Sequence, residues 1–232
     1  VVAMADCPLL LGMAILPDGG VLTNDAAGRR VLKLTAEGRV EIVHDLSSLC
    51  ATMLNEVHRF PDGSLLVGEF GFDILQGEEP VAQRLVLISP DGQVRRHGPE
   101  IGFANGMASI DGGRAVLVAE YVGGAVWRFE QGEGGRIDEG RRIASGIGTG
   151  VDGIAVAPDG SVWFASMPEG FLARLDSAGR VAEKRETDFG HATSLAFDPS
   201  GGAVYATVLE NMPTPETMGQ ADGAVVRLVL AA

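Results

Sequence analysis

The sequence predicts an all-β fold, a β-propeller of four-stranded blades, and three observations support that class. A strand–turn–strand unit recurs along the chain, its turns carry Pro-Asp-Gly or a close relative, and no segment shows the periodicity of a long amphipathic helix. Proline presets φ for the first turn position and glycine accepts a positive φ, so these turns favour hairpins.

Five copies of the unit align on their turns. Each copy consists of a short apolar strand, the turn, and a second strand rich in Val, Leu, Trp, Phe and Tyr. The copies are LGMAILPDGGVLTN (11–24), NEVHRFPDGSLLVG (55–68), NGMASIDGGRAVLVA (105–119), DGIAVAPDGSVWFA (152–165) and TSLAFDPSGGAVYAT (193–207).

A second hairpin follows most copies at a similar offset, at 31–43, 84–97, 125–138 and 172–184. Four short strands recurring about every 40 to 50 residues are typical of propeller blades. A β-sandwich lacks such even repetition, and a β-helix uses shorter repeats. A propeller hides its edges only when its blades close a circle, so about five visible blades predict either a five-bladed ring or a ring with one blade missing from this sequence.

Length and composition predict one soluble domain over residues 1–232, with neither a nucleic-acid nor a membrane partner. Lys and Arg total 18 against 31 Asp and Glu, a formal net charge of −13 at pH 7, which excludes the basic surface that phosphates require. No segment approaches the roughly 18 uninterrupted apolar residues of a membrane span. The two cysteines, Cys7 and Cys50, form no disulfide framework, and a cytoplasmic location is expected.

The residue just before the first strand of each copy defines a column: Leu11, Asn55, Asn105, Asp152 and Thr193. The first strand of a propeller blade lines the central channel, so the column predicts a ring of side chains at one mouth of the channel. Oxygen donors from Asn, Asp and Thr suit a hard divalent cation. We therefore predict one bound divalent metal ion, with Ca²⁺ favoured and Mn²⁺, Mg²⁺ or Zn²⁺ as alternatives.

Each polar member of the column also has a structural explanation, because Asn and Asp in such places commonly hydrogen-bond neighbouring backbone amides. Their recurrence at one repeat position favours a site. Glu69 and Glu120 end the second strands of their copies and are predicted to reach the same mouth and contact substrate. Strand ends of this kind also form salt bridges, which is the alternative explanation for both.

Three segments, LNEVHRFPDGSLLVGEFGFD, FANGMASIDGGRAVLVAE and VDGIAVAPDGSVWFA, resemble successive blades of the SMP-30/gluconolactonase/LRE-like family, and the likeness runs from about residue 10 to the C-terminus. The resemblance implies a six-bladed propeller with one divalent metal ion in its channel, and lactone hydrolysis as the activity. It also implies that Asn55 lies near substrate and metal, that Asn105 is a metal ligand, and that Asp152 binds the metal and acts in catalysis.

The chain departs from the family pattern in several places. The Glu-Gly-Pro motif of the family's first blade has no counterpart and Leu11 occupies the column position, so the first blade is expected to lie upstream of Val1. Glu56 follows Asn55 where the family usually has Asp, and Met53 stands where relatives that hydrolyse sugar lactones carry Arg. The last difference argues against a phosphorylated or heavily hydroxylated substrate.

The predicted function is metal-dependent hydrolysis of a small-molecule lactone. A bound cation polarises the lactone carbonyl, and Asp152 positions or deprotonates the attacking water. The predicted substrate contacts are Asn55, Glu69, Glu120 and Thr193. Two other classes remain open: a non-catalytic propeller that serves as a binding module, and a metal-independent propeller similar to strictosidine synthase, in which a Glu or His acts in the channel.

Overall fold

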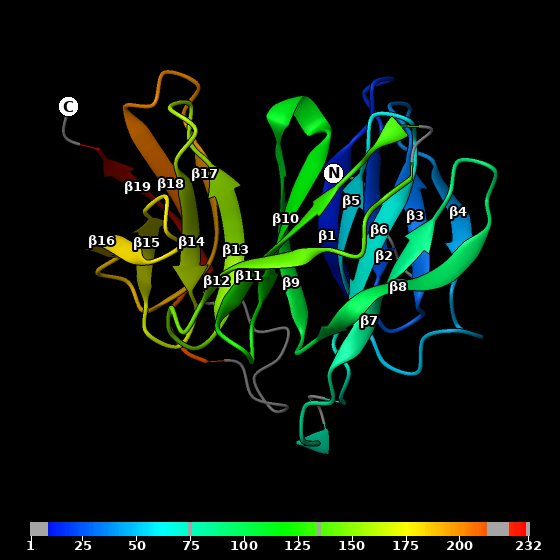
Figure 1. Ribbon diagram of the computed structural model, residues 1–232, viewed down its shortest axis with the longest axis horizontal. Helices are drawn as coiled ribbons and strands as arrows, with labels where there is room; N and C mark the ends of the chain where they lie inside the picture. The colour runs from blue at the N-terminus through cyan, green and yellow to red at the C-terminus, as the bar shows by residue number, and fades with distance from the viewer. Residues whose placement is uncertain (1–8, 74–75, 134–135, 213–222, 231–232) are drawn as a thin grey trace. The chain divides into compact units, whose positions relative to one another are not determined.

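The structure is a computed structural model that describes residues 9–73, 76–133, 136–212 and 223–230. Its strands follow one another as five antiparallel sheets, each a meander in which strands adjacent in the sequence pair (Figure 1). Consecutive four-stranded meanders are propeller blades, so the predicted all-β propeller is confirmed. The fifth sheet has three strands in the described part of the chain, where four were predicted.

The described residues group into two compact units, of which the first ends at Ala104 and also includes Glu133 and Arg136. The first unit contains two sheets. The first sheet consists of β1 (Leu10–Ile15), β2 (Val21–Asp25), β3 (Arg30–Leu34) and β4 (Val40–Asp45), and the second of β5 (Leu54–Arg59), β6 (Leu65–Glu69), β7 (Gln83–Ile88) and β8 (Val94–Ile101).

The second unit begins at Asn105 and contains the other three sheets. Its elements are β9 (Ala104–Ile110), the short 3-10 helix η2 (Asp111–Gly113), β10 (Ala115–Glu120), β11 (Ala125–Glu130), β12 (Arg141–Ser145), β13 (Val151–Val156), β14 (Val162–Ser166), β15 (Phe171–Leu175), β16 (Val181–Glu186), β17 (His191–Phe197), β18 (Ala203–Leu209) and β19 (Gly223–Val229). Within the described ranges, no helix has the length and apolar character needed to cross a membrane.

One predicted hairpin is misplaced. The hairpin expected at 125–138 begins correctly with β11, but its return strand, β12, starts only at Arg141. An isolated bridge between Gln131 and Ile137 lies in the intervening stretch. Glycines make that stretch resemble a tight turn, although it is an insertion between paired strands.

Neighbouring sheets within each unit bury the core between their apolar faces. Successive residues of a strand point to opposite faces, and the fourth sheet uses both of its faces. Phe164 packs in one cluster with Leu117 of the third sheet. The adjacent Trp163 packs in another cluster with Leu195 of the fifth sheet. The continuous apolar run VWFA therefore follows from burial on both faces of the sheet.

Glycines allow the first strands of neighbouring sheets to approach closely. A Cβ on Gly12 of β1 would lie 2.8 Å from backbone atoms of Asn55 and Glu56 in β5. A Cβ on Gly106 of β9 would lie 2.6 to 2.7 Å from backbone atoms of residues 152–154 in β13. Cβ atoms in proteins essentially never lie within 3.0 Å of another heavy atom. The residue after the column position must therefore be glycine in these two strands.

We expect Gly106→Ala to lower the free energy of unfolding by about 1–3 kcal/mol, the usual cost of overpacking. The contacted atoms belong to the backbone of β13, which is paired with β14. They therefore cannot rotate away as a side chain would. Thermal or urea unfolding measures the change. Gly202→Ala is the matched control, because the nearest atom to its Cβ is Ser200 Oγ at 3.5 Å; equal losses in the two variants would contradict this expectation.

His58 is a buried polar residue of the second sheet. Its side chain is 7% exposed, and its ring meets Phe60 edge to face with centroids 4.9 Å apart. The buried Nε2 has no hydrogen-bond partner among the described residues. Burial lowers the pKa of His58 to about 4, because desolvation penalises the imidazolium. The folded protein therefore holds His58 neutral.

This burial predicts a loss of stability in mild acid. As pH falls from 6.5 toward about 4, the unfolded chain protonates His58 and the folded protein does not, so the free energy of unfolding decreases. The full loss is about 3 kcal/mol. His58→Leu should flatten this part of the stability curve in denaturant titrations between pH 7 and 4. A slope identical to that of the unmodified protein would show that other groups cause the acid sensitivity.

Candidate functional site

The column residues lie on the first strands of the five sheets. Leu11, Asn55, Asn105 and Asp152 are each the second residue of that strand, in β1, β5, β9 and β13, and Thr193 is the third residue of β17. Each of these strands forms one edge of its sheet. The alignment of turns in the sequence therefore identified corresponding positions in the blades.

Three of the five first strands are irregular at the column position. The ladder between β5 and β6 skips Asn55 and Glu56. The ladder between β13 and β14 skips Asp152 and Gly153, and that between β17 and β18 skips Thr193. A β-bulge leaves residues out of the ladder and changes the direction of their side chains, often next to functional sites. The bulges thus separate these polar residues from the regular alternation of their strands.

Asn55 is held by two hydrogen bonds within the first unit. The residue is 6% exposed, and its Nδ2 donates to the carbonyl oxygen of Ala104 at 3.1 Å. Its own carbonyl oxygen accepts a hydrogen bond from Nδ2 of Asn24 at 2.8 Å. Because the amide nitrogen is engaged, Oδ1 is the side-chain atom of Asn55 that is left to bind a ligand.

Asn24 contacts Asn55 and was not predicted from the sequence to lie near the site. It is fully buried, and its Oδ1 has no partner among the described residues. The corresponding residues of the other four second strands are Gly68, Ala119, Ala165 and Thr207. An amide side chain at a position that is small and apolar in three of the other four copies was the signal available in the sequence.

The carbonyl group that holds Asn55 follows a residue in an unusual backbone conformation. Phe103 has a φ of 59°, which is uncommon for a bulky side chain. Its ring stacks on Phe70 with centroids 4.4 Å apart and meets Phe72 edge to face at 5.4 Å. This packing offsets the cost of the left-handed conformation of Phe103. That conformation determines how the chain continues to Ala104, whose carbonyl oxygen accepts the hydrogen bond from Asn55.

Glu56 shares the bulge with Asn55, and the sequence indicated it only as a departure from the family pattern. Burial raises the pKa of the Glu56 carboxyl to about 7, because desolvation penalises the carboxylate. A hydrogen bond from the backbone of Val57 opposes this effect. A carboxyl group that titrates near neutral pH can take up or release a proton in a reaction.

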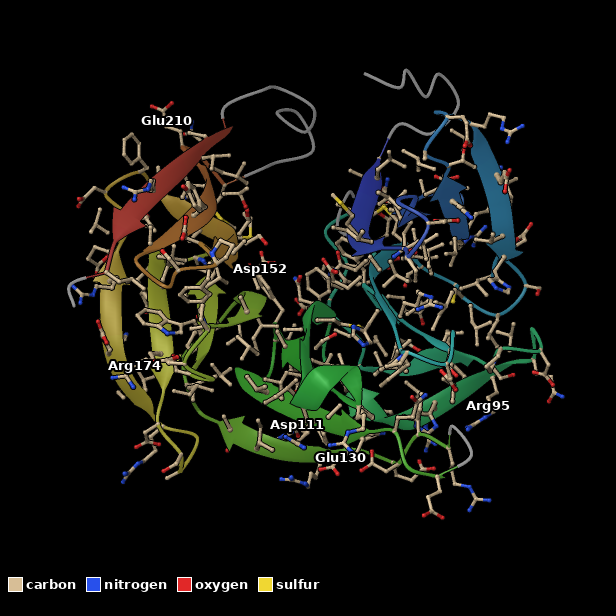
Figure 2. All side chains as sticks on the ribbon, turned by 90° about the horizontal axis from the view of Figure 1, so that it is seen from above. Arg95, Asp111, Glu130, Asp152, Arg174 and Glu210 are labelled. Carbon is tan, nitrogen blue, oxygen red and sulfur yellow. The ribbon has the colours of Figure 1, made fainter. Side chains whose placement is uncertain are left out.

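Asp152 is half-buried on β13, the edge strand of the fourth sheet, and Arg174 lies two strands away on β15 (Figure 2). The charge of Asp152 acts on the phenol of Tyr121. Burial, and in second place the negative charge of Asp152, raise the pKa of Tyr121 to about 12. Both effects disfavour the phenolate, so Tyr121 keeps its hydroxyl proton.

Hydrogen bonds to backbone groups connect segments of three sheets beside Asp152. The amide of Gly150 donates to the carbonyl of Tyr121 at 2.9 Å, and the amide of Met167 donates to the carbonyl of Gly150 at 3.0 Å. Nδ1 of His191 lies 3.0 Å from the carbonyl oxygen of Met167. Since a carbonyl can only accept, Nδ1 carries the proton, and Nε2 is the basic nitrogen of the neutral ring.

Asn105 and Thr193 differ in their surroundings. Asn105 is 6% exposed at the start of β9. The hydroxyl of Thr193 donates to the carbonyl of Thr207 at 3.2 Å and lies 2.8 Å from the hydroxyl of Thr207. The Thr193 hydroxyl is therefore hydrogen-bonded within its own sheet, and its contact with substrate stays a prediction.

Glu69 and Glu120 also have partners within their own sheets. Oε1 of Glu69 pairs with Nη1 of Arg96 at 2.8 Å, and the Glu69 side chain is 2% exposed. Oε2 of Glu120 accepts a hydrogen bond from Nε1 of Trp127 at 2.7 Å and pairs with Nη2 of Arg142 at 3.3 Å. These contacts favour a stabilising role at the blade ends; substrate contact by either glutamate stays a prediction.

The chemistry of the predicted metal ligands fits a hard divalent cation. Asn55 and Asn105 offer amide oxygens and Asp152 a carboxylate, the ligand types that Ca²⁺ and Mg²⁺ prefer. The buried Oδ1 of Asn24 adds an oxygen that a water molecule or a hydrated ion would satisfy. Across the four described ranges, no group of three or more His, Cys, Asp or Glu side chains is placed to hold a metal ion, and the predicted ligand set depends on asparagine amides.

Comparison with solved structures shows the fold. The chain is similar to a luciferin-regenerating enzyme, with a TM-score of 0.72, 18% identity, and coverage of 94% of this chain and 76% of that one. It is similar to a gluconolactonase from Xanthomonas campestris, with a TM-score of 0.64, 17% identity, and coverage of 85% and 68%. It is also similar to the calcium-binding protein regucalcin from Agrobacterium tumefaciens, with a TM-score of 0.61, 18% identity, and coverage of 98% and 92%.

A protein-family model also matches this chain, although none of the curated proteins does. The model of the SMP-30/Gluconolactonase/LRE-like region matches residues 2–209. That match spans most of the sequence, including all five column positions. This protein therefore belongs to the SMP-30/gluconolactonase/LRE-like family.

Proposed function

We propose that this protein hydrolyses lactones with the help of a bound divalent metal ion. One observation carries the proposal: Asn55, Asn105 and Asp152 occupy the same position on the first strands of three sheets. The first strands of propeller blades line a common channel, so equivalent positions suit a shared ligand. Membership of the SMP-30/gluconolactonase/LRE-like family supports the same activity.

The proposed ligands are Asn55, Asn105 and Asp152, with Ca²⁺ as the favoured ion and Mn²⁺, Mg²⁺ or Zn²⁺ as alternatives. When bound, the cation supplies Lewis-acid polarisation of the lactone carbonyl. Three oxygen ligands with one negative charge among them predict modest affinity. The net charge of −13 attracts cations and favours a neutral substrate over an anionic one.

The residues of the chain position the reactants. The carboxylate of Asp152 accepts a hydrogen bond from the attacking water and orients it. The water oxygen adds to the carbonyl carbon and the C–O bond of the ring breaks, so the product is a hydroxy acid that retains both water hydrogens. The hydrogen bond from Asn55 to Ala104 at 3.1 Å keeps the amide in one orientation, which limits the entropy lost on binding.

The test is hydrolysis of a lactone panel by chelator-treated protein, with Ca²⁺, Mn²⁺, Mg²⁺ and Zn²⁺ restored one at a time. We expect turnover to disappear on chelation and to return with at least one ion. The unfolding temperature should rise with the same ion, because a ligand of the native state stabilises it. Turnover that survives chelation would overturn the metal requirement. Absence of turnover with every ion would overturn the enzyme and favour a binding module.

A metal-independent reaction is the second candidate, and the geometry of His191 favours it. Its Nδ1 is engaged with the carbonyl of Met167, so Nε2 is available as a general base at the start of β17, the first strand of the sheet that follows the Asp152 sheet. Turnover insensitive to chelator, lost in His191→Gln and retained in Asp152→Asn, would support this candidate over the first.

A further inference from the structure

We infer that the surface beside Asp152 binds an apolar substituent of the substrate, so that the preferred lactones carry an alkyl or aryl group rather than several hydroxyls. The inference rests on the proposed lactone hydrolysis and names the substrate class of that same site. It is carried by a surface formed by the half-buried ring of Tyr121 and the half-buried thioether of Met167, together with the exposed pyrrolidine ring of Pro168.

The surface is rigidly attached to the strand that carries Asp152. Gly150 lies two residues before Asp152 and bonds through its backbone to Tyr121 and to Met167. A Cβ on Gly150 would lie 2.1 Å from Cδ of Pro168 and 3.3 Å from Cζ of Tyr121. The Tyr121 ring and Pro168 therefore pack directly over the Gly150 backbone. Apolar atoms held in place in this way form a specific contact for a ligand at little entropic cost.

Three polar atoms on and around this surface have intramolecular partners. The hydroxyl of Tyr121 donates to Sδ of Met167 at 3.6 Å. Nδ1 of His191 is occupied by the carbonyl of Met167, and the hydroxyl of Thr193 by Thr207.

A polyhydroxylated lactone would bind poorly against such a surface. Each sugar hydroxyl that loses water without gaining a partner weakens binding, and the Tyr121 hydroxyl and Nδ1 of His191 already have intramolecular partners. An alkyl or aryl group loses no hydrogen bond on entering the same space and gains from removal of its apolar area from water. The difference favours apolar substituents for any substrate whose ring carbonyl lies at Asp152.

The experiment compares kcat/KM of the metal-loaded protein for three lactones: γ-butyrolactone, γ-nonalactone and δ-gluconolactone. We expect γ-nonalactone to exceed γ-butyrolactone by about tenfold or more, since removal of two methylenes from water, at roughly fourfold each, already gives that ratio. We expect δ-gluconolactone to be the poorest of the three. A preference for δ-gluconolactone would overturn the inference while leaving lactone hydrolysis intact, and absence of turnover on all three would overturn both.

Two variants test the residues. Met167→Gln keeps the length of the side chain and adds polar atoms, so the ratio of kcat/KM for γ-nonalactone over γ-butyrolactone should fall about fivefold or more. Tyr121→Phe removes only the hydroxyl, so the same ratio should be retained. Val122→Gln is the matched control, because Val122 is 48% exposed on the same turn as Tyr121. An equal fall in Val122→Gln, or no fall in Met167→Gln, would contradict the assignment.

Discussion

Asp152→Asn is expected to lower kcat/KM for lactone hydrolysis by about 10²- to 10⁴-fold, the range attributed to a positioned acid–base group. Asparagine preserves the size of the side chain but removes the negative charge, and with it both the attraction for a cation and the stronger acceptor for the attacking water. The half-buried position of Asp152 in a β-bulge predicts little change in the free energy of unfolding.

The measurement pairs steady-state kinetics with thermal unfolding. Asp188→Asn is the matched control, because Asp188 is exposed and has a φ of 58°, a conformation that asparagine tolerates. The control should retain turnover. If Asp152→Asn retained full activity, Asp152 would not be the catalytic carboxylate, and if it lost activity only through unfolding, its role would be structural.

Arg96→Met is expected to lower the free energy of unfolding by about 3–5 kcal/mol, the cost of leaving a buried charge without its partner. Its partner Glu69 has a side chain that is 2% exposed, with Oε1 2.8 Å from Arg96. Arg96 also donates to the carbonyl oxygens of Arg84 at 2.8 Å and Leu49 at 2.9 Å. Its loss therefore leaves a buried carboxylate without its partner, while the two carbonyl oxygens are exposed and can bind water instead.

The double variant Glu69→Leu/Arg96→Met should be more stable than Arg96→Met alone, because removing both charges removes the desolvation penalty. Arg180→Met is the control: Arg180 is 78% exposed and pairs with Asp176 at 2.9 Å, so its loss should cost less than about 1 kcal/mol. Equal losses for Arg96→Met and Arg180→Met in denaturant unfolding would disprove the importance of burial.

Glu69→Gln separates the two roles considered for Glu69. A blade-stabilising role predicts a lower unfolding temperature with KM retained. The substrate contact expected from the sequence predicts the opposite, a raised KM at an unchanged unfolding temperature. The ion pair with Arg96 favours the first outcome.

Most of the strand order could be predicted from local sequence, because each turn marks itself. Pro-Asp-Gly or Asp-Pro-Ser-Gly separates the paired strands in four of the five aligned copies. The third copy has Asp-Gly-Gly at 111–113 instead. The start of β12 at Arg141 could not be predicted. Its pairing with β11 spans a glycine-rich insertion, and register across an insertion is decided by packing rather than by turn chemistry.

The strand positions of the proposed ligands could be predicted from the sequence, but their surroundings could not. The repeat placed Asn55, Asn105 and Asp152 at corresponding points of their strands. It did not show that Asn24 and Ala104 hold Asn55. Those partners come from a different strand in each case, and nothing in the order of residues links them.

The sequence by itself determined the repeating strand–turn–strand unit, the all-β class and the column that contains Asp152, because all three depend on residues close together in the chain. Only the tertiary structure decided the protonation of Glu56 and His58 and the ion pair of Glu69 with Arg96. Burial and electrostatic partners depend on residues that are distant in sequence and meet only when the sheets pack.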